Sequence, residues 1–169
     1  ESVHAIVTSP PYYCQRDYRV AGQIGVESSP AAYVAALAPV FAAARRVLRK
    51  DGTLWLNLGD TYSGAGSGTG GRAGKEFEPS RAAKELIGHV RGRRKNKLGL
   101  PWRVAFALGD LGWTLRQDIT WHKPNPTPEG VYDRPTTAHE HVFQFSRARH
   151  YFYDRIACPT DSGAPEEDA

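Results

Sequence analysis

The positions of apolar residues along this chain predict short strands that alternate with longer helices. Residues 3–7 form an apolar run that stops at the turn-forming Ser9-Pro10-Pro11, which predicts a buried strand. A helix is predicted from Ser29-Pro30, where a capping hydroxyl precedes a proline at the first helical position, to about Lys50. Its apolar stripe should consist of Tyr33, Val34, Leu37, Val40, Phe41, Ala44, Val47 and Leu48.

Two features should limit this helix. Pro39 lies inside it and is expected to kink it or to destabilise it by about 3 kcal/mol. Asp51-Gly52 is expected to end it. Residues 53–58 then predict a second buried strand, so the strand, helix and strand should form a right-handed parallel crossover.

The later part of the chain predicts one more helix and two more strands. Leu100-Pro101 opens a helix that should stop at Gly112. Residues 113–122, with imperfect alternation, and residues 140–145 predict two strands whose connection is too short for a normal helical crossover, so we expect them to pair antiparallel. The sequence therefore predicts an α/β fold in which a partly parallel sheet has flanking helices and an antiparallel edge hairpin.

Length and composition indicate a single domain and reveal one strongly basic segment. The chain has 169 residues, of which 40% are hydrophobic, enough for the core of one domain. Its formal charge is +4, but residues 61–97 hold nine basic and three acidic residues, a local +6 that leaves the rest near −2. This segment is expected to contact a polyanion; the alternative is a solvated loop without a partner.

The expected domain is residues 1–154, with a basic, flexible insertion at about 61–98 and an acidic tail or linker at 155–169. The insertion contains a glycine-rich run, residues 64–71. Three of its glycines have the G-x-G-x-x-G spacing, but Arg72-Ala73 replaces the Lys and Ser/Thr of a phosphate-binding loop. The run therefore favours a flexible linker.

Other residue types argue against several classes of protein. Cys14 and Cys158 stand far apart and in no paired motif, which excludes a disulfide framework and indicates a reducing compartment. His139 and His141 lack a third ligand at recognisable spacing, so no metal site is expected. With no membrane-length apolar run and no signal-like amino terminus, a cytoplasmic location without membrane contact is expected.

The most informative stretch is Thr8-Ser9-Pro10-Pro11-Tyr12, which follows the first predicted strand. Two consecutive prolines fix φ and donate no backbone N–H, so the carbonyls of Ser9 and Pro10 are held as acceptors. An amine on a planar base would find two acceptors, the Ser9 side chain and the Pro10 carbonyl, and a ring to stack on at Tyr12.

On these residues the sequence resembles the amino-group (cytosine-N4 or adenine-N6) DNA methyltransferases, whose hallmark is (Asp/Asn/Ser)-Pro-Pro-(Tyr/Phe) at the end of a strand. The resemblance covers about residues 2–154, because further motifs follow in the family's order: Gly22-Gln23-Ile24-Gly25, the strand within residues 51–60, residues 121–126 and His139-Glu140-His141. It implies a Rossmann-like sheet, S-adenosyl-L-methionine as cofactor and double-stranded DNA as partner. The target base would be flipped out of the duplex.

The resemblance also implies roles for individual residues. Methyl transfer would be direct, with Ser9, Pro10, Pro11 and Tyr12 as the catalytic residues. Thr8 and Ser9 would contribute weakly to cofactor binding. DNA or base contacts are expected from Arg16, Asn57, Asp60, Arg93, Arg94, Lys95, Asn125 and Arg134.

Several of these roles have alternatives. Asn57 and Asp60 could equally serve strand-end and turn hydrogen bonding, and Arg16 with Asp17 could order the loop over the target. Glu140 is expected to be a structural hydrogen-bond acceptor. Cys14 is not expected to act as a cytosine-C5 nucleophile, because Tyr13 rather than proline precedes it.

Serine at the first hallmark position favours cytosine-N4 as the target, with adenine-N6 as the alternative. The chain departs from the family in lacking the Asp-Pro-Phe-x-Gly-x-Gly turn that holds the cofactor. We therefore expect the catalytic half of an enzyme of permuted order, with the cofactor-binding half missing or supplied by a second subunit, and self-association when it is alone. Alternatives are a non-catalytic DNA-binding fragment and methylation of RNA or of a protein amide.

Overall fold

The computed structural model describes residues 2–63, 95–126, 129–154 and 156–157. The glycine-rich run at 64–71, most of the expected insertion with Arg93 and Arg94, and nearly all of the expected tail lie outside the described residues. The described elements are β1 (Val3–Thr8), α1 (Pro30–Val47), β2 (Leu48–Leu58), α3 (Leu100–Asp110), β3 (Thr114–His122) and β4 (His139–Ser146).

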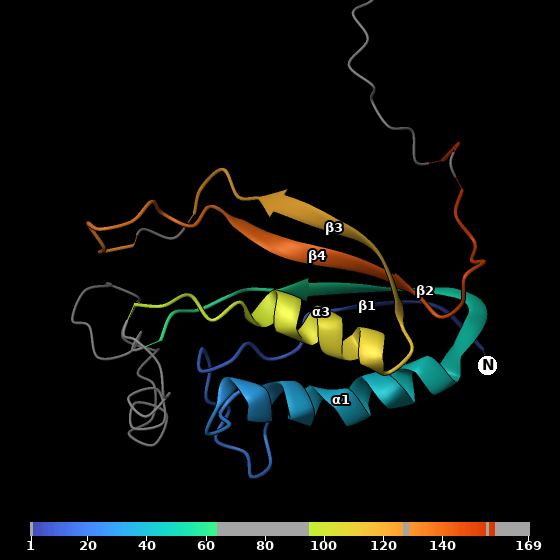
Figure 1. The fold of residues 1–169 in the computed structure, drawn as a ribbon, viewed down its shortest axis with the longest axis horizontal. Helices are drawn as coiled ribbons and strands as arrows, with labels where there is room; N and C mark the ends of the chain where they lie inside the picture. The colour runs from blue at the N-terminus through green and yellow to red at the C-terminus, as the bar shows by residue number, and fades with distance from the viewer. Residues whose placement is uncertain (1, 64–94, 127–128, 155, 158–169) are drawn as a thin grey trace, which may run out of the picture.

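The four described strands form one sheet in the order β1-β2-β4-β3. β1 and β2 are parallel, whereas β4 runs antiparallel to both β2 and β3. Figure 1 shows α1 and α3 running side by side next to β1 and β2. The expected α/β fold, with its parallel crossover and antiparallel hairpin, is therefore confirmed.

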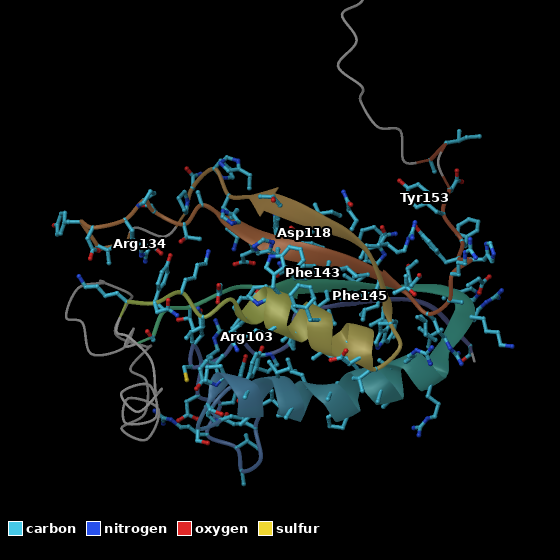
Figure 2. All side chains as sticks on the ribbon, in the orientation of Figure 1. Arg103, Asp118, Arg134, Phe143, Phe145 and Tyr153 are labelled. Atoms are coloured by element: carbon cyan, nitrogen blue, oxygen red, sulfur yellow. The ribbon has the colours of Figure 1, made fainter. Side chains whose placement is uncertain are left out.

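The core lies between the two helices and one face of the sheet. Leu54 and Leu56 of β2 are fully buried, and the register places them beside Phe145 and Phe143 of β4. Both phenylalanines point toward α3 in Figure 2, where the Phe143 ring lies 5.1 Å from that of Trp102. The helices contribute further buried side chains, among them Tyr33, Leu37 and Phe41 from α1 and Leu100, Val104 and Leu108 from α3.

Two expectations about burial were wrong. β1 is not buried: Val7 is 80% exposed, because β1 is an edge strand and Val7 shares with Trp55 the sheet face opposite the core. In the predicted helix stripe, Val40 and Val47 are also exposed. The core-facing residues of α1 recur at every fourth position, and these two valines lie off that line.

The boundary between α1 and β2 also differs from the prediction. α1 ends at Val47, and Leu48 already has an extended backbone, so Asp51-Gly52 lies within β2 instead of ending the helix. Leu48 is fully buried, and its packing against the core outweighs the local turn signal. A Cβ at Gly52 would lie 2.8 Å from the His4 carbonyl, so glycine there permits the close approach of β1.

The remaining local features follow from sequence and packing. α1 continues as one helix through Pro39. The imperfect alternation predicted for β3 corresponds to a register shift between Leu115 and Gln117 in its pairing with β4. None of the helices described here is long and apolar enough to cross a bilayer.

Asp60 connects the end of β2 to the start of α3. Its carboxylate accepts hydrogen bonds from the backbone N–H groups of Thr61 at 2.9 Å and of Gly99 and Leu100 at 3.0 Å each. Gly99, the residue before α3, has a left-handed backbone and no side chain that could cap the helix. Asp60 therefore supplies from a distance the acceptor that a helix amino terminus requires.

Replacing this carboxylate should loosen the start of α3. We expect Asp60→Ala to lower the free energy of unfolding by about 1–2 kcal/mol, because buried N–H groups lose their acceptor. The measurement is a urea unfolding curve. Asp51→Ala is the matched control: it removes an exposed carboxylate whose ion-pair partner among the described residues is Arg49, and it should leave the midpoint nearly unchanged. Equal shifts in the two variants would contradict the anchoring role of Asp60.

Candidate active site

The hallmark residues lie at one edge of the sheet with residues from two other strands. Ser9 to Tyr12 follow β1, and Asn57 lies near the end of the parallel strand β2, so both reach the carboxyl edge of that pair. Because β4 runs the opposite way, Glu140 at its beginning reaches the same edge. The fold thus gathers residues from three distant parts of the sequence.

Contacts with α1 and with the Gly22–Gly25 motif hold the hallmark loop in place. The Tyr33 hydroxyl of α1 donates a hydrogen bond to the Pro11 carbonyl at 3.0 Å. The Cys14 N–H donates to the Gly25 carbonyl at 2.6 Å. Gly25 has a φ of +105°, and a Cβ there would lie 3.0 Å from the Tyr12 carbonyl, so this position needs glycine.

Hydroxyl, amide and carboxylate oxygens converge on Tyr12. Its Oη lies 2.6 Å from Asn57 Oδ1, 3.1 Å from Glu140 Oε2 and 3.2 Å from Ser9 Oγ. Ser9 Oγ is also 3.4 Å from Asn57 Oδ1. The second oxygen of Glu140 forms an ion pair with Lys123. The structure thus brings together Ser9, Tyr12 and Asn57 with Lys123 and with Glu140, which the sequence suggested only as a structural hydrogen-bond acceptor.

The orientation of the Asn57 amide follows from its other contact. Its Nδ2 donates to the backbone carbonyl of His141 at 3.2 Å. A carbonyl can only accept, so the nitrogen must face it and the oxygen must face Tyr12 and Ser9. Asn57 therefore presents an acceptor to both hydroxyl groups.

The Pro10 carbonyl remains available for a ligand. Within the described ranges it accepts no hydrogen bond. Ser9 and Pro10 both line a cavity of about 520 Å³, whose wall also includes Arg16, Trp121 and Glu140. The hallmark residues that were expected to supply the two acceptors thus border open space.

A second cavity of about 410 Å³ lies beside the first and shares Tyr12, Lys123 and Glu140 with it. Its other wall includes Asp60 and Arg134. Tyr12 and the ion pair therefore border both cavities, a position in which they could contact a ligand in either one.

Burial and charge set the protonation of the central groups. Burial raises the pKa of Tyr12, and the nearby Glu140 carboxylate raises it further. Burial also acts to raise the pKa of Glu140, but hydrogen bonds from Lys123, Tyr12 and Asn57 outweigh it and hold that pKa below its usual value. At neutral pH, Tyr12 keeps its proton and Glu140 is ionised.

Two other reactive side chains lie apart from this chemistry. Burial raises the pKa of the Cys14 thiol to about 11, so it stays protonated at neutral pH and is a poor nucleophile. His141 Nδ1 lies 2.8 Å from Asp118 Oδ1. Among the described residues, no group of three His, Cys, Asp or Glu side chains is arranged to hold a metal ion.

The loop after the hallmark is tied by its own side chains. The Asp17 carboxylate accepts from the Arg19 N–H at 2.8 Å and from Gln23 Nε2 at 2.6 Å, and Gln23 Oε1 accepts from the Tyr18 N–H. These bonds agree with the expected role of Asp17 in ordering the loop. They hold Arg16 at the wall of the first cavity.

The remaining predicted residues lie around the β3–β4 connection. Arg134 stacks over the Tyr62 ring at 4.0 Å and pairs with Glu129 at the wall of the second cavity, and Figure 2 shows it on the connection beyond the strands. Lys95 pairs with Asp133, and Asn125 is exposed. DNA contact by these residues stays a prediction, as does contact by Asp60, whose oxygens are occupied by backbone amides.

The sequence assigned no role in the site to Tyr33, Gly59 or Lys123. Tyr33 was predicted only as part of a helix stripe, Gly59 only within the strand motif at residues 51–60, and Lys123 only within the motif at residues 121–126. A Cβ at Gly59 would lie 2.7 Å from Cε2 of Tyr12. Glycine at this position is therefore what lets the Tyr12 ring reach its partners.

Comparisons with known proteins agree with this geometry. A family model described as DNA methylase, of the N6/N4 type, matches residues 3–167. The chain is 46% identical over 165 residues to the Type II methyltransferase M.XycI of Xanthomonas campestris pv. cyanopsidis, a match that covers 96% of this chain and 54% of that protein. It is 47% identical to M.Cfr9I of Citrobacter freundii, over 90% of this chain and 51% of the relative. The chain thus spans about half the length of the curated relatives it matches.

Solved structures show a similar fold. The PvuII DNA methyltransferase, which is cytosine-N4-specific, superposes with a TM-score of 0.60 at 16% identity, over 95% of this chain and 49% of that one. A candidate DNA modification methylase of Thermus thermophilus, in complex with S-adenosyl-L-methionine, gives a TM-score of 0.56 at 22% identity, with 95% and 49% coverage. At these identities the likeness concerns the fold alone.

Adding one methyl group at Gly59 should disturb the site. Tyr12 is tied to Asn57 and Glu140, so its ring cannot move away without breaking those bonds, and we expect Gly59→Ala to cost about 1–3 kcal/mol of unfolding free energy. Gly109→Ala is the control, because a Cβ there meets nothing within 4 Å and helix propensity should give about 0.5–1 kcal/mol of stabilisation. Urea unfolding of both variants provides the comparison; shifts of the same sign would contradict the close packing at Gly59.

Proposed function

This chain belongs to the N6/N4 DNA methylase family, and on that premise we propose that it methylates the exocyclic amine of a base in double-stranded DNA. The observation that carries the proposal is that Ser9, Pro10 and Tyr12, the residues that would supply two acceptors and a stacking ring, together line one open cavity. A planar base with an amino group matches that arrangement.

The acceptors would act on the nitrogen lone pair. An aryl amine is a poor nucleophile because its lone pair is delocalised into the ring. Hydrogen bonds from both N–H groups to Ser9 and Pro10 would favour a pyramidal nitrogen and would stabilise the positive charge that develops there. Flipping the base out of the duplex costs a few kcal/mol, of which stacking on Tyr12 would return about 1–3 kcal/mol.

S-adenosyl-L-methionine is the proposed cofactor, and when bound it supplies an electrophilic methyl group. The cavity beside Ser9, which would receive its cationic end, is lined by the rings of Tyr18 and Trp121 and by the Glu140 carboxylate. Two basic side chains also line it, Arg16 and Lys123, and the second of these is paired with Glu140. Thr8 and Ser9, at the carboxyl end of β1, would border that end. We also propose a cytoplasmic location, because DNA is the proposed substrate.

We propose cytosine-N4 as the target, with adenine-N6 as the alternative, on the strength of serine at the first hallmark position. Membership of the N6/N4 family is compatible with either target base. The product of the reaction identifies the base directly, whereas the shape of the cavity does not.

The proposed domain arrangement is a catalytic half with the hallmark first, residues 1–154, that works with a cofactor-binding half in the same polypeptide or in a second subunit. Support comes from the relatives, which are about twice as long as the stretch they share with this chain. It also comes from β1, an edge strand whose Val7 is 80% exposed, since apolar sheet edges are normally covered.

The proposal is tested by methyl transfer from labelled S-adenosyl-L-methionine to unmethylated duplex DNA, with the proposed cofactor-binding half present in the same polypeptide or added as a second subunit, followed by nucleoside digestion and mass analysis. We expect N4-methylcytosine, and a loss of about 10²–10³-fold in rate for Ser9→Ala, which removes one transition-state acceptor. Tyr12→Ala should also lose activity. Ser28→Ala, an exposed serine outside both cavities, is the control.

N6-methyladenine as the product would keep the function and change the base. DNA binding without methyl transfer, by folded protein that is supplied with both the cofactor and the cofactor-binding half, would instead favour a non-catalytic binding module. Unchanged transfer by Ser9→Ala would remove the hallmark from the mechanism.

A further inference from the structure

We infer that Glu140, held by Lys123, is the final acceptor of a proton relay that leads from the methylated amine through the hydroxyl groups of Ser9 and Tyr12. The inference rests on the proposed function and adds to it a destination for the amine proton.

The relay follows the contacts around Tyr12. Ser9 Oγ lies 3.2 Å from Tyr12 Oη, and Tyr12 Oη lies 3.1 Å from Glu140 Oε2. A phenol has one proton to donate, and its two acceptors here are Glu140 and Asn57. An amide oxygen cannot keep a proton at neutral pH, so Glu140 is the member of this group that can retain one.

The chemistry balances along this path. When the amine has formed its bond to the methyl group, the nitrogen is positively charged and carries one proton too many. Ser9 Oγ takes that proton while its own proton passes to Tyr12 Oη, and the Tyr12 proton passes to Glu140 Oε2. The electron pair of the broken N–H bond stays on nitrogen, where it is again delocalised into the base, and the carboxylate becomes a neutral acid.

A weak base is sufficient for this step. A protonated aryl amine is a strong acid, because losing the proton restores the delocalised lone pair, so even a carboxylate of low pKa takes the proton. The low pKa has an advantage, since Glu140 stays ionised before each turnover. The side chain of Lys123 is 38% exposed, so the pair has contact with solvent through which the proton can leave.

The charged and titratable groups around Glu140 come from several elements. Lys123 follows β3 and Tyr12 follows β1. His139 and His141 are the neighbours of Glu140 along β4, and His141 is paired with Asp118. The cavities that Glu140 borders also contain other such groups, Arg16, Tyr18, Asp60, Tyr62, Lys97, Glu129 and Arg134. Of the acids among them, Asp60 is bonded to backbone amides and Glu129 to Arg134. Glu140 is the one bonded to Tyr12.

The hydroxyl of Tyr12 gains a specific purpose from this relay. The hallmark admits phenylalanine at this position, so stacking of the base does not require the hydroxyl. In this chain the residue that β2 places beside Tyr12 is Asn57, whose amide cannot retain the proton. The Tyr12 hydroxyl connects Ser9 to a carboxylate that can retain it, Glu140 on β4.

The first test is the single-turnover rate of methyl transfer as a function of pH. We expect Glu140→Gln to lower the rate by about 10²–10⁴-fold, the usual range for a lost general base. The wild-type rate should stay constant as the pH falls from neutral into the mildly acidic range, because the pKa of Glu140 is held below its usual value, and should decline only where Glu140 becomes protonated. The variant's rate should instead rise with pH, since solvent must take the proton.

Formate should restore part of the rate of Glu140→Ala, because it can occupy the space and accept the proton; a residue needed only for structure would not be replaced in this way. Asp51→Asn, which removes an ion-paired carboxylate at the far end of β2, is the control and should behave as wild type. A Glu140→Gln variant with the wild-type rate and pH profile, or an Ala variant that formate does not restore, would overturn the relay.

A double-mutant cycle tests the path itself. Tyr12→Phe keeps the ring but removes the connecting hydroxyl, so it should lower the rate by a factor similar to that of Glu140→Gln. The two changes together should lower it no further than either alone, because they interrupt one relay. Multiplicative effects would mean that Tyr12 and Glu140 act independently.

One readout does not depend on activity. The negative charge of Glu140 contributes to the raised pKa of Tyr12, so Glu140→Gln should lower the pKa of this phenol. It can be followed by NMR of protein with carbon-labelled tyrosine rings, with Tyr12→Phe to assign the signal. An unchanged pKa would sink the relay and leave the proposed function intact, whereas absence of methyl transfer by wild type would sink the function and leave this contact established.

Discussion

The site depends on one oxygen atom, the hydroxyl of Tyr12, because it joins three segments that are distant in the sequence. It contacts Ser9 in its own loop, Asn57 on β2 and Glu140 on β4. The sheet register makes this possible: Thr8 pairs with Leu56, and Leu58 pairs with His141. A slip of one residue in either pairing would turn Asn57 or Glu140 to the opposite face of the sheet. The register that buries the core leucines therefore also assembles the site.

How far the sequence predicts this arrangement depends on how local each feature is. The order of elements, the hairpin and the position of the hallmark after a strand were all predicted, because periodicity, caps and connection lengths depend on residues that are close in the sequence. Burial of β1 was predicted wrongly, since the position of a strand in the sheet decides its burial, and Val7 lies on an uncovered face. The Tyr12–Glu140 contact joins residues 128 positions apart and has no local signal.

The end of β2 shows how adjacent residues divide several tasks. From the sequence, Asn57 and Asp60 had the same expected role, with strand-end hydrogen bonding as the alternative for both. In the structure Asn57 faces the hydroxyl groups of the site, whereas Asp60 fixes the first residues of α3. Between them, Leu58 is buried in the core, and Gly59 leaves room for the Tyr12 ring. Alternation along the strand distinguishes the core residue Leu58 from the site residue Asn57. Tertiary contacts are needed to distinguish Asp60, which anchors α3, from Asn57, which faces the site.

The Lys123–Glu140 pair is better explained by chemistry than by stability. Glu140 is only 18% exposed, so its charge has lost much of its hydration, and the attraction to Lys123 roughly offsets that loss. The β3–β4 hairpin does not need the pair, because it is paired from Thr114 to His122 and packed through Leu115 and the β4 phenylalanines. Glu140 is thus an ionised carboxylate that adds little to stability. It contacts the hydroxyl of Tyr12, where a charged group can accept a proton. The ion pair keeps that acceptor ready without making it so basic that it would be protonated before the reaction begins.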